Sequence, residues 1–600
     1  MALQYQFGLL SNGTIFKHKM LPSKPISPLS TITTCRVPRT IQCVATTLVV
    51  SDQNTTFRRC VNSFKPSIWD YDYIQSLRSD FVEESYAKER DRLKEEVRDM
   101  FSKFADLVDQ LEFIDVLQRL GVAAHFNLEI RNIMENTYNN YNNNGILKRR
   151  PNSLYATALE FRLLRHHGYN VSSDLFNGFL DSENHFDSRL SVDIRGLLSL
   201  YEASFLSTEG EMILDEARDF SSTCLKKFLR KNKDENDEIF ILVNHSLELP
   251  LYWRTSRLEA RWFIDVYQQR RQNVSPSLLK LAKLDFNVVQ VQHQEDLKHT
   301  SRWWKGIGLG EKLNFAIRDR IVENFFWTVG LAFQPQLGHF RRLMAKVNAL
   351  ITTIDDIYDA FGKFEELQLF TEVVDRWDVN AMDELPGYVK ICFLALYNFV
   401  NEVAFDFLKD HGQNIIHHLK KAWADLCKSY MIEAKWYYYD YQPTLQEYLE
   451  NAWISISAPV ILVHAYFALP TSNINDENFV RLEDYYELIH SSATILRLAN
   501  DMGTSKREKE TGDIPKSIEC YMKETGASES DAHRHIKSLV FEAWKKINTE
   551  TANSFYSKSF IQISENLARM SLYMYQHGDG HTVQDSQTMN HILFQPIVGI

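Results

Sequence analysis

The chain has 600 residues, of which 44% are hydrophobic and 24% are charged, and its formal net charge is −11. This length exceeds one ordinary hydrophobic core and predicts two or more domains. The composition is typical of a globular protein, and the acidic balance argues against general nucleic-acid binding. No run of about 18 apolar residues occurs, so no membrane span is expected.

The seven cysteines are scattered and form no CxxC pair. Their spacing argues against a disulfide framework and against a zinc–thiolate site. A reducing compartment fits this pattern better than an oxidising one.

The first 51 residues differ from the rest because they are rich in Ser and Thr and carry Lys and Arg, but no acidic residue before Asp52. This composition predicts an organelle transit peptide. A disordered basic tail is the alternative.

After this leader the pattern is helical. Leucine or isoleucine recurs every third or fourth residue across residues 107–120, and Gly121 follows as a helix-ending residue. The apolar run Ile239–Val243 is expected as buried helix or loop, because no partner strand is evident. The charged stretches Lys231–Glu238 and Gln268–Ser277 are expected to be linkers, with a domain boundary near the second.

Residues 343–362 read LMAKVNALITTIDDIYDAFG, with apolar residues at helical spacing and Gly362 placed to end the helix. Asp355, Asp356 and Asp359 stand at i, i+1 and i+4. An α-helix places Asp355 and Asp359 on one face, with Asp356 about 100° away. Such crowded carboxylates repel one another, and Mg²⁺, which prefers oxygen ligands, is their natural partner. A solvent-facing acidic helix end is the alternative.

Asn500, Thr504 and Glu508 recur every fourth residue near the C-terminus. This spacing puts an amide, a hydroxyl and a carboxylate in one row of a helix. All three supply oxygen ligands that suit Mg²⁺. The alternative is a polar helix face with Asn500 as a cap.

An anionic substrate held between two metal-binding helices also needs cationic donors. Arg318 and Arg320 precede the aspartate helix, Arg497 lies one turn before the second row of ligands, and Lys516 follows that row. The planar fork of arginine suits oxyanions because it can donate two parallel hydrogen bonds. Taken singly, each of these cations is more typical of a protein surface.

These motifs together resemble those of plant class I terpene synthases, of the angiosperm monoterpene synthase type. The matching residues are Asp355-Asp356-x-x-Asp359 and Asn500-Asp501-x-x-Thr504-x-x-x-Glu508 for the two metal motifs, Arg318-Asp319-Arg320 for the RxR element, Trp327 for an active-site tryptophan, and Asp579-Gly580-His581 for the loop that closes the site. The resemblance extends over nearly the whole chain after the leader.

The resemblance implies an all-α fold with two domains: an N-terminal α-barrel-like helical domain at residues 58–275 and a C-terminal catalytic, metal-binding class I terpenoid synthase bundle at residues 276–600. Residues 1–57 would then form a plastid transit peptide and leader that directs the enzyme to the chloroplast stroma. A monomer is expected.

The resemblance also implies a mechanism. Mg²⁺, with Mn²⁺ as a substitute, would be held by Asp355, Asp356, Asp359, Asn500, Thr504 and Glu508, while Arg318, Arg320, Arg497 and Lys516 would complete the neutralisation of a prenyl diphosphate. Asp355, Asp359 and Asn500 would thus also line the diphosphate site. Bound metal makes diphosphate a good leaving group, and the resulting carbocation must be kept from water. Trp327 and Tyr575 would stabilise that cation through their ring faces, with core packing as the alternative for aromatic residues.

Two further elements resemble the family, and one position departs from it. In the run ISISAPV, Ser455, Ser457 and Pro459 predict a helix break, because proline removes a backbone donor. In similar enzymes such a break lines the pocket. Arg58-Arg59, followed by Trp69, resembles the tandem-arginine element with one extra residue. Thr511 stands where relatives commonly carry arginine.

Geranyl diphosphate is the expected substrate, and the product a cyclic or acyclic monoterpene hydrocarbon or alcohol. Leu496 stands where isoprene synthases typically carry phenylalanine, which leaves room for a longer substrate. A sesquiterpene synthase acting on farnesyl diphosphate is one alternative. A chain-elongating prenyltransferase would normally show a second aspartate-rich motif. A non-catalytic helical scaffold is the alternative of another class, and a Mg²⁺-dependent diphosphate-release assay separates it from an enzyme.

Overall fold

The computed structural model describes residues 67–82, 84–144, 153–232, 234, 237–270, 274–313, 318–470, 482, 486–511, 514–553, 556–578 and 586–599. The chain divides into two compact units, Met1–Thr55 and Thr56–Ile600, and every described residue belongs to the second. The predicted transit peptide and the Arg58-Arg59 pair therefore lie outside the described residues.

The first group of helices precedes the predicted domain boundary. It consists of α1 Tyr71–Ser76, α2 Glu84–Met100, α3 Leu107–Arg119, α4 Asn127–Asn144, α5 Leu154–His166, α6 Ile194–Ser204, α7 Met212–Lys231, α8 Glu238–Glu248 and α9 Ser256–Gln269. Short 3₁₀ turns connect some of them: η1 Asp80–Val82, η2 Phe101–Lys103, η3 Ala123–Phe126, η5 Ser173–Phe179, η6 Ser188–Val192 and η7 Leu251–Trp253.

The second group follows that boundary. It consists of α10 Pro276–Ile307, α11 Leu309–Lys312, α12 Ile321–Leu331, α13 Gly338–Asp356, α14 Phe364–Arg376, α15 Gly387–His411, α16 Ile416–Tyr438, α17 Leu445–Ser455, α18 Ala458–Ala468, α20 Glu487–Thr511, α21 Ser517–Thr525, α22 Glu529–Asn553, α23 Lys558–Met574 and α24 Ser586–Leu593, with the turns η8 Pro335–Leu337, η9 Ile357–Phe361 and η10 Val379–Glu384. No strand occurs in the described ranges, which confirms the all-α prediction.

The stripe at residues 107–120 forms α3 as predicted. Leu111, Ile114 and Leu117 are at most 1% exposed, because their spacing turns them all toward the core. Gly121 ends the helix with φ +77°, a left-handed conformation that favours glycine. A Cβ atom at Gly121 would lie 2.9 Å from the Cβ of Ala260, so the glycine also permits a close approach to α9.

The two charged stretches are connecting segments, as predicted. One joins the end of α7 to the start of α8, and the other joins α9 to α10. The apolar run Ile239–Val243 lies inside α8, which confirms a helix in place of a strand. Pro276 opens α10 behind Ser275, whose hydroxyl accepts the Leu278 N–H at 3.3 Å, a typical helix start.

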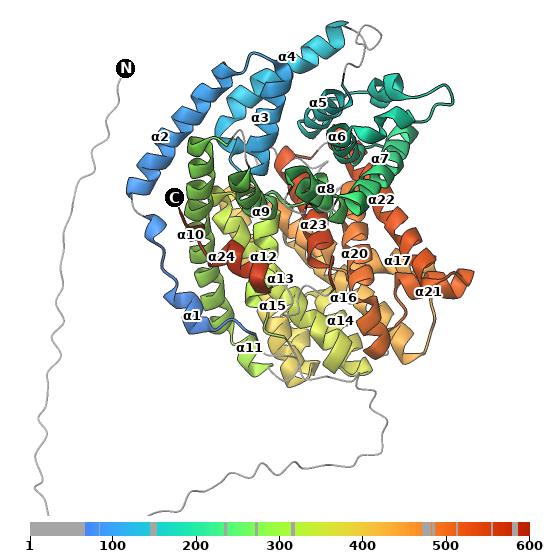
Figure 1. Cartoon of the computed structure of the whole chain (residues 1–600). Helices are drawn as coiled ribbons and strands as arrows, with labels where there is room; N and C mark the ends of the chain where they lie inside the picture. The colour runs from blue at the N-terminus through green and yellow to red at the C-terminus, as the bar shows by residue number, and fades with distance from the viewer. Residues whose placement is uncertain are drawn as a thin grey trace, which may run out of the picture. The chain divides into compact units, whose positions relative to one another are not determined.

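The two groups of helices pack extensively against each other. Helices α1 and α2 lie along α10, and α24 returns to contact α9 and α10 (Figure 1). The Tyr252 hydroxyl donates to Asn548 Oδ1 at 3.0 Å, and Arg569 Nε donates to the Tyr252 carbonyl oxygen at 2.7 Å. These contacts join α22 and α23 of the second group to the first group of helices.

Five helices of the second group form a ring of contacting neighbours: α12 contacts α13, α13 contacts α18, α18 contacts α20, α20 contacts α23, and α23 contacts α12. All eleven residues of α12 are buried, including the polar residues Glu323, Asn324 and Thr328. Helix α16 packs against α17, α18 and the turn η9. The predicted site residues lie on α12, α13 and α20 of this ring, at the end of α23, and in segments next to these helices.

Two helical segments within the described ranges are long and apolar enough to cross a membrane by length and composition, Gly387–His411 and Leu445–Ala468. The protein interior buries 39% of the apolar stretch in Gly387–His411 and 78% of the apolar stretch in Leu445–Ala468. Core helices of soluble proteins pass the same test, so these segments are weak evidence for a membrane span.

Candidate active site

The aspartate helix departs from the prediction in its last turn. Helix α13 ends at Asp356, and residues 357–361 form a π turn in which the Gly362 N–H donates to the Ile357 carbonyl oxygen at 2.7 Å. Gly362 ends the segment, as predicted. Because the π turn is wider than an α turn, the expected shared face of Asp355 and Asp359 does not follow from α-helical spacing. Asp356 is 2% exposed, whereas Asp359 is exposed.

Arg318 joins the RxR element to the aspartate helix. Its backbone N–H and its Nε donate to the two carboxylate oxygens of Asp356 at 2.6 and 2.7 Å, and its Nη2 donates to Asp355 at 3.1 Å. Desolvation nevertheless raises the pKa of both carboxyl groups above the usual value, although Arg318 opposes the shift. The pair therefore lies where further positive charge is favoured.

Tyr430 on α16 lies near residues of both predicted metal-binding helices. Its hydroxyl donates to Asp355, and the charges of Asp355, Asp359, Glu433 and Arg497 all act on it. Burial and the neighbouring carboxylates raise the pKa of Tyr430 well above its usual value. Sequence reasoning missed this residue, because a tyrosine on the buried face of a helix carries no signal that separates it from core packing.

The second row of candidate ligands lies on α20. Asn500 Oδ1 accepts from Arg497 Nη1 at 3.2 Å, and the Thr504 hydroxyl donates to the Asn500 carbonyl oxygen at 2.9 Å, one turn earlier. Both side chains thus lie on the face that carries Arg497. The backbone of Glu508 belongs to α20, but its side chain lies outside the described residues.

Asp501, the neighbour of Asn500, contacts two other helices. Its carboxylate is fully buried and accepts the Tyr448 hydroxyl at 2.9 Å and the Ser517 N–H at 3.3 Å. Arg497 Nη1 lies 3.4 Å from the same carboxylate. Asp501 therefore anchors α20 to α17 and α21, a role that the sequence motif alone did not assign.

The remaining cations are buried. Arg497 is 6% exposed and donates to the Ala452 carbonyl oxygen at 3.1 Å and to the Ser455 hydroxyl at 3.0 Å. Lys516 is 6% exposed, and its Nζ lies 3.6 Å from a Glu433 oxygen. Arg320 is 7% exposed and donates to the Asp319 carbonyl oxygen at 2.8 Å. All are thus fixed inside the protein, unlike typical surface charges.

The two aromatic candidates lie together. The ring centroids of Trp327 on α12 and Tyr575 at the end of α23 are 6.2 Å apart, with the planes inclined by 54°. Phe325 and Phe326 are at most 1% exposed, in agreement with core packing. The Asp579-Gly580-His581 loop that follows Tyr575 lies outside the described residues.

Gly503 permits the close approach that brings Tyr575 to α20. A Cβ atom at this position would lie 2.7 Å from the Tyr575 carbonyl oxygen and 3.2 Å from the Gly578 carbonyl oxygen. Only a residue without a side chain fits there. A glycine between two candidate metal ligands is a signal that sequence reasoning did not use.

The predicted helix break is confirmed. Helix α17 ends at Ser455, α18 begins at Ala458, and Ser457 between them has φ +69°, a strained conformation for a residue other than glycine. Pro459 follows at the start of α18. The break leaves the Ser455 hydroxyl within reach of Arg497.

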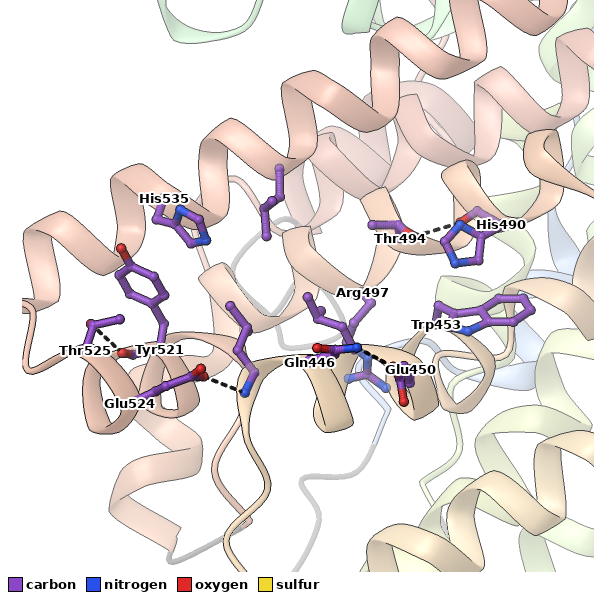
Figure 2. A pocket seen from close by; sticks show the side chains of 13 residues that line it. Gln446, Glu450, Trp453, His490, Thr494, Arg497, Tyr521, Glu524, Thr525 and His535 are labelled. Atoms are coloured by element: carbon purple, nitrogen blue, oxygen red, sulfur yellow. Dashed lines mark hydrogen bonds between the residues drawn. The ribbon is translucent and has the colours of Figure 1, made fainter.

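A cavity of about 510 Å³ lies between α17, α20, α21 and α22. Figure 2 shows Arg497 among the lining residues, with Gln446, Glu450 and Trp453 from α17 and His490 and Thr494 from α20. The lining includes Arg497 but none of the aspartates of α13. This cavity therefore meets the candidate active site only at Arg497.

The donors present fit a magnesium ion. Asp355, Asp356, Asn500 and Thr504 offer carboxylate, amide and hydroxyl oxygens, the ligand type that Mg²⁺ prefers. In the part of the chain that the structure describes, no three His, Cys, Asp or Glu side chains converge as a metal cluster. Mg²⁺ does not require such a cage, because it takes one or two protein carboxylates and completes its shell with phosphate oxygens and water.

Comparison with known proteins agrees with this geometry. Residues 68–247 match the terpene synthase N-terminal domain, and residues 305–546 match the metal binding domain of the terpene synthase family. A (−)-alpha-terpineol synthase of Vitis vinifera is 56% identical over 537 residues, which cover 89% of this chain and 90% of that protein. A chloroplastic myrcene synthase of Quercus ilex is 52% identical over 597 residues, which cover 98% of both.

Two solved structures are similar over almost their whole length. Limonene synthase with 2-fluorolinalyl diphosphate has a TM-score of 0.87 and 43% identity, and the match covers 90% of this chain and 100% of that one. Isoprene synthase from grey poplar leaves, in complex with three Mg²⁺ ions and dimethylallyl-S-thiolodiphosphate, has a TM-score of 0.80 and 43% identity, with 89% and 99% covered.

Proposed function

This chain belongs to the terpene synthase family, and we propose that it is a monoterpene synthase that ionises geranyl diphosphate with the help of Mg²⁺. One observation carries the proposal: Asp355, which is paired with Arg318, and Arg497 on α20 both lie near Tyr430. Carboxylates for metal and buried cations for phosphate thereby border one site.

The oxygen ligands that would hold Mg²⁺ are Asp355, Asp356, Asp359, Asn500, Thr504 and Glu508. The similar isoprene synthase structure contains three Mg²⁺ ions with a diphosphate compound, which supports this metal in preference to others. Mn²⁺, which accepts the same ligands, is the expected substitute. When bound, the metal supplies Lewis acidity that makes diphosphate a better leaving group.

Arg318, Arg320, Arg497 and Lys516 are the cations that would bind the diphosphate oxygens. Arginine suits this task because its fork donates two parallel hydrogen bonds to a phosphate. The burial of Arg320, Arg497 and Lys516 strengthens each such contact, since water screens it less than at the surface. Arg318 would then exchange part of its contact with Asp355 and Asp356 for the substrate.

The apolar part of the substrate would lie against Trp327 and Tyr575. Their ring faces can stabilise a cation that forms when the carbon–oxygen bond breaks. Leu496, which is 4% exposed, is smaller than the phenylalanine that isoprene synthases typically carry there and agrees with a substrate longer than five carbons. The named relatives, a terpineol and a myrcene synthase, support a ten-carbon substrate.

The leader and the domain limits complete the proposal. Several relatives are named chloroplastic, among them the myrcene synthase, and this supports a plastid location, with the stroma as the compartment. We place the N-terminal domain at residues 58–275 and the catalytic domain at residues 276–600, since the α9–α10 connection lies between them.

A product assay tests this function. The full chain is incubated with geranyl or farnesyl diphosphate in the presence of Mg²⁺ or EDTA, and the organic layer is analysed by gas chromatography–mass spectrometry. Ten-carbon products from geranyl diphosphate that disappear with EDTA are expected. Fifteen-carbon products alone would make the chain a sesquiterpene synthase, and no product from either substrate would favour a non-catalytic scaffold.

The metal assignment has its own test. Asp355→Ala should reduce turnover at least about 100-fold, because a charge that acts at the reacting group is lost, while circular dichroism and the melting temperature stay close to wild type. Asp383→Ala, which removes an exposed carboxylate paired with Lys390, serves as the control. Wild-type turnover in Asp355→Ala would contradict the assignment.

A further inference from the structure

A buried carboxylate, Glu433, lies near two of the predicted diphosphate-binding cations, Lys516 and Arg497. Glu433 on α16 is 7% exposed, and its Oε2 lies 3.6 Å from Lys516 Nζ. Its Oε1 accepts the Ser455 hydroxyl, and Asn451 Nδ2 donates to the same oxygen at 3.4 Å. Nothing in the metal or RxR motifs points to this glutamate.

Ser455 connects Glu433 to Arg497. The serine hydroxyl donates its proton to Glu433 and accepts from Arg497 Nη2 at 3.0 Å. A hydroxyl can donate and accept at once, so it relays one charge-assisted contact to the next. Glu433 thus contacts Lys516 directly and Arg497 through one hydroxyl.

The position of Glu433 follows from helix α16. Tyr430 and Glu433 stand at i and i+3 and therefore share a face of the helix. Tyr430 donates to Asp355 on α13, and Glu433 contacts the residues around α20. One face of α16 thereby connects the carboxylate side of the site to its cationic side.

The energetics favour a positioning role. Two buried cations would repel each other and would be costly to desolvate without a nearby anion. Glu433 supplies that anion, yet the 3.6 Å separation from Lys516 leaves this contact weaker than a short ion pair. Lys516 can therefore keep its orientation and still donate to a ligand.

We propose that Glu433 is a positioning residue of the diphosphate site, which holds Lys516 directly, and Arg497 through Ser455, in the orientation that a diphosphate requires. This inference rests on the proposed function, because it assumes that these cations bind diphosphate. It implies that the affinity for diphosphate depends on a carboxylate that never touches the ligand.

Glu433 could also have the opposite effect and weaken diphosphate binding, and the experiment has to distinguish the two. A carboxylate beside an anion site also repels the anion. If repulsion dominated, Glu433→Gln would bind diphosphate more tightly than wild type, because glutamine keeps the shape and removes the charge. If positioning dominates, Glu433→Gln releases Lys516 and weakens the relay to Arg497, and affinity falls.

Binding of inorganic diphosphate in the presence of Mg²⁺ measures the difference. The full chain and its variants are compared by isothermal titration calorimetry and by inhibition of geranyl diphosphate turnover. We expect Glu433→Gln to raise the dissociation constant and the inhibition constant about tenfold, the effect of one lost charge-assisted contact. KM for geranyl diphosphate should rise with them, and the melting temperature without ligand should fall, because two buried cations lose their nearby anion. Glu433→Asp, which keeps the charge, should restore part of the affinity.

Glu84→Gln is the matched control. It removes the same charge from the exposed start of α2, in the N-terminal group of helices, where Glu84 pairs with Lys88. Its constants should equal those of wild type. If Glu433→Gln does not fold, Ser455→Ala interrupts the relay and should weaken diphosphate binding severalfold.

The outcomes separate this inference from the function on which it rests. Unchanged or tighter diphosphate binding in Glu433→Gln, with an active wild type, would overturn the positioning role alone. A lower turnover number with unchanged binding and KM would also overturn it, since that pattern reports a reduced folded fraction. A wild-type chain that neither binds diphosphate nor consumes geranyl diphosphate would overturn the proposed function itself.

Discussion

Replacing Gly503 with alanine has two opposite effects on stability: it improves helix propensity but overfills the packing around α20. In a helix interior, alanine is about 1 kcal/mol more favourable than glycine, so propensity alone predicts a more stable protein. The added Cβ atom, however, would lie 2.7 Å from the Tyr575 carbonyl oxygen, where ordinary contact begins at 3.4 Å. Helix α20 and the end of α23 would have to separate by about 0.7 Å, the difference between these distances.

The cost of this separation exceeds the gain in propensity. Overpacking of a filled interior typically costs 1–3 kcal/mol, and the opposing atoms here belong largely to the backbone, which cannot rotate away. The displacement would also shift Asn500 and Thr504 relative to Tyr575. Because a misplacement of about 1 Å in an active site can reduce the rate about 100-fold, we expect kcat/KM to fall 10- to 100-fold.

The assay combines steady-state kinetics with geranyl diphosphate and thermal unfolding. Gly387→Ala is the control, since it makes the same change at the start of α15 with no atom within 4 Å of the new Cβ. We expect Gly387→Ala to match wild type in activity, and Gly503→Ala to lose both activity and stability. A Gly503→Ala protein with a higher melting temperature and unchanged kcat/KM would refute the packing argument.

Two further predictions concern stability. Burial raises the pKa of Glu323 on α12 to about 7. The pKa of this carboxyl group is higher in the folded protein than in the unfolded chain. The folded protein therefore loses stability as the pH rises from about 4.5, the unfolded pKa, to about 7, the folded pKa, and the loss amounts to up to about 3 kcal/mol. Glu323→Gln should therefore raise the melting temperature at pH 8 but not at pH 4.5, and equal shifts at both would contradict this. Ser457→Gly should raise the free energy of unfolding by about 0.5–1 kcal/mol in urea titrations, because it removes the left-handed strain at φ +69°, whereas Ser457→Ala should not.

Helical periodicity and chemical type made much of the molecule readable from the sequence. The stripe at residues 107–120 predicted α3 because burial requires apolar residues on one helix face. The aspartates at 355, 356 and 359 and the row that begins at Asn500 predicted metal-binding faces, because clustered oxygen ligands are costly without a cation. The break at Ser457 followed from the proline that comes after it. All of these are local signals, set by residues within a turn or two.

Contacts between distant segments were decided by the tertiary structure. Tyr430 and Glu433 carry no local mark of function, and only the packing of α16 places them beside Asp355 and Lys516. The π turn after Asp356 altered a face that regular α spacing predicted. Gly503 mattered because the end of α23 lies against it, 72 residues later in the chain at Tyr575. Periodicity determines which face of a helix is buried, but the identity of the atoms opposite that face depends on how all the helices pack together.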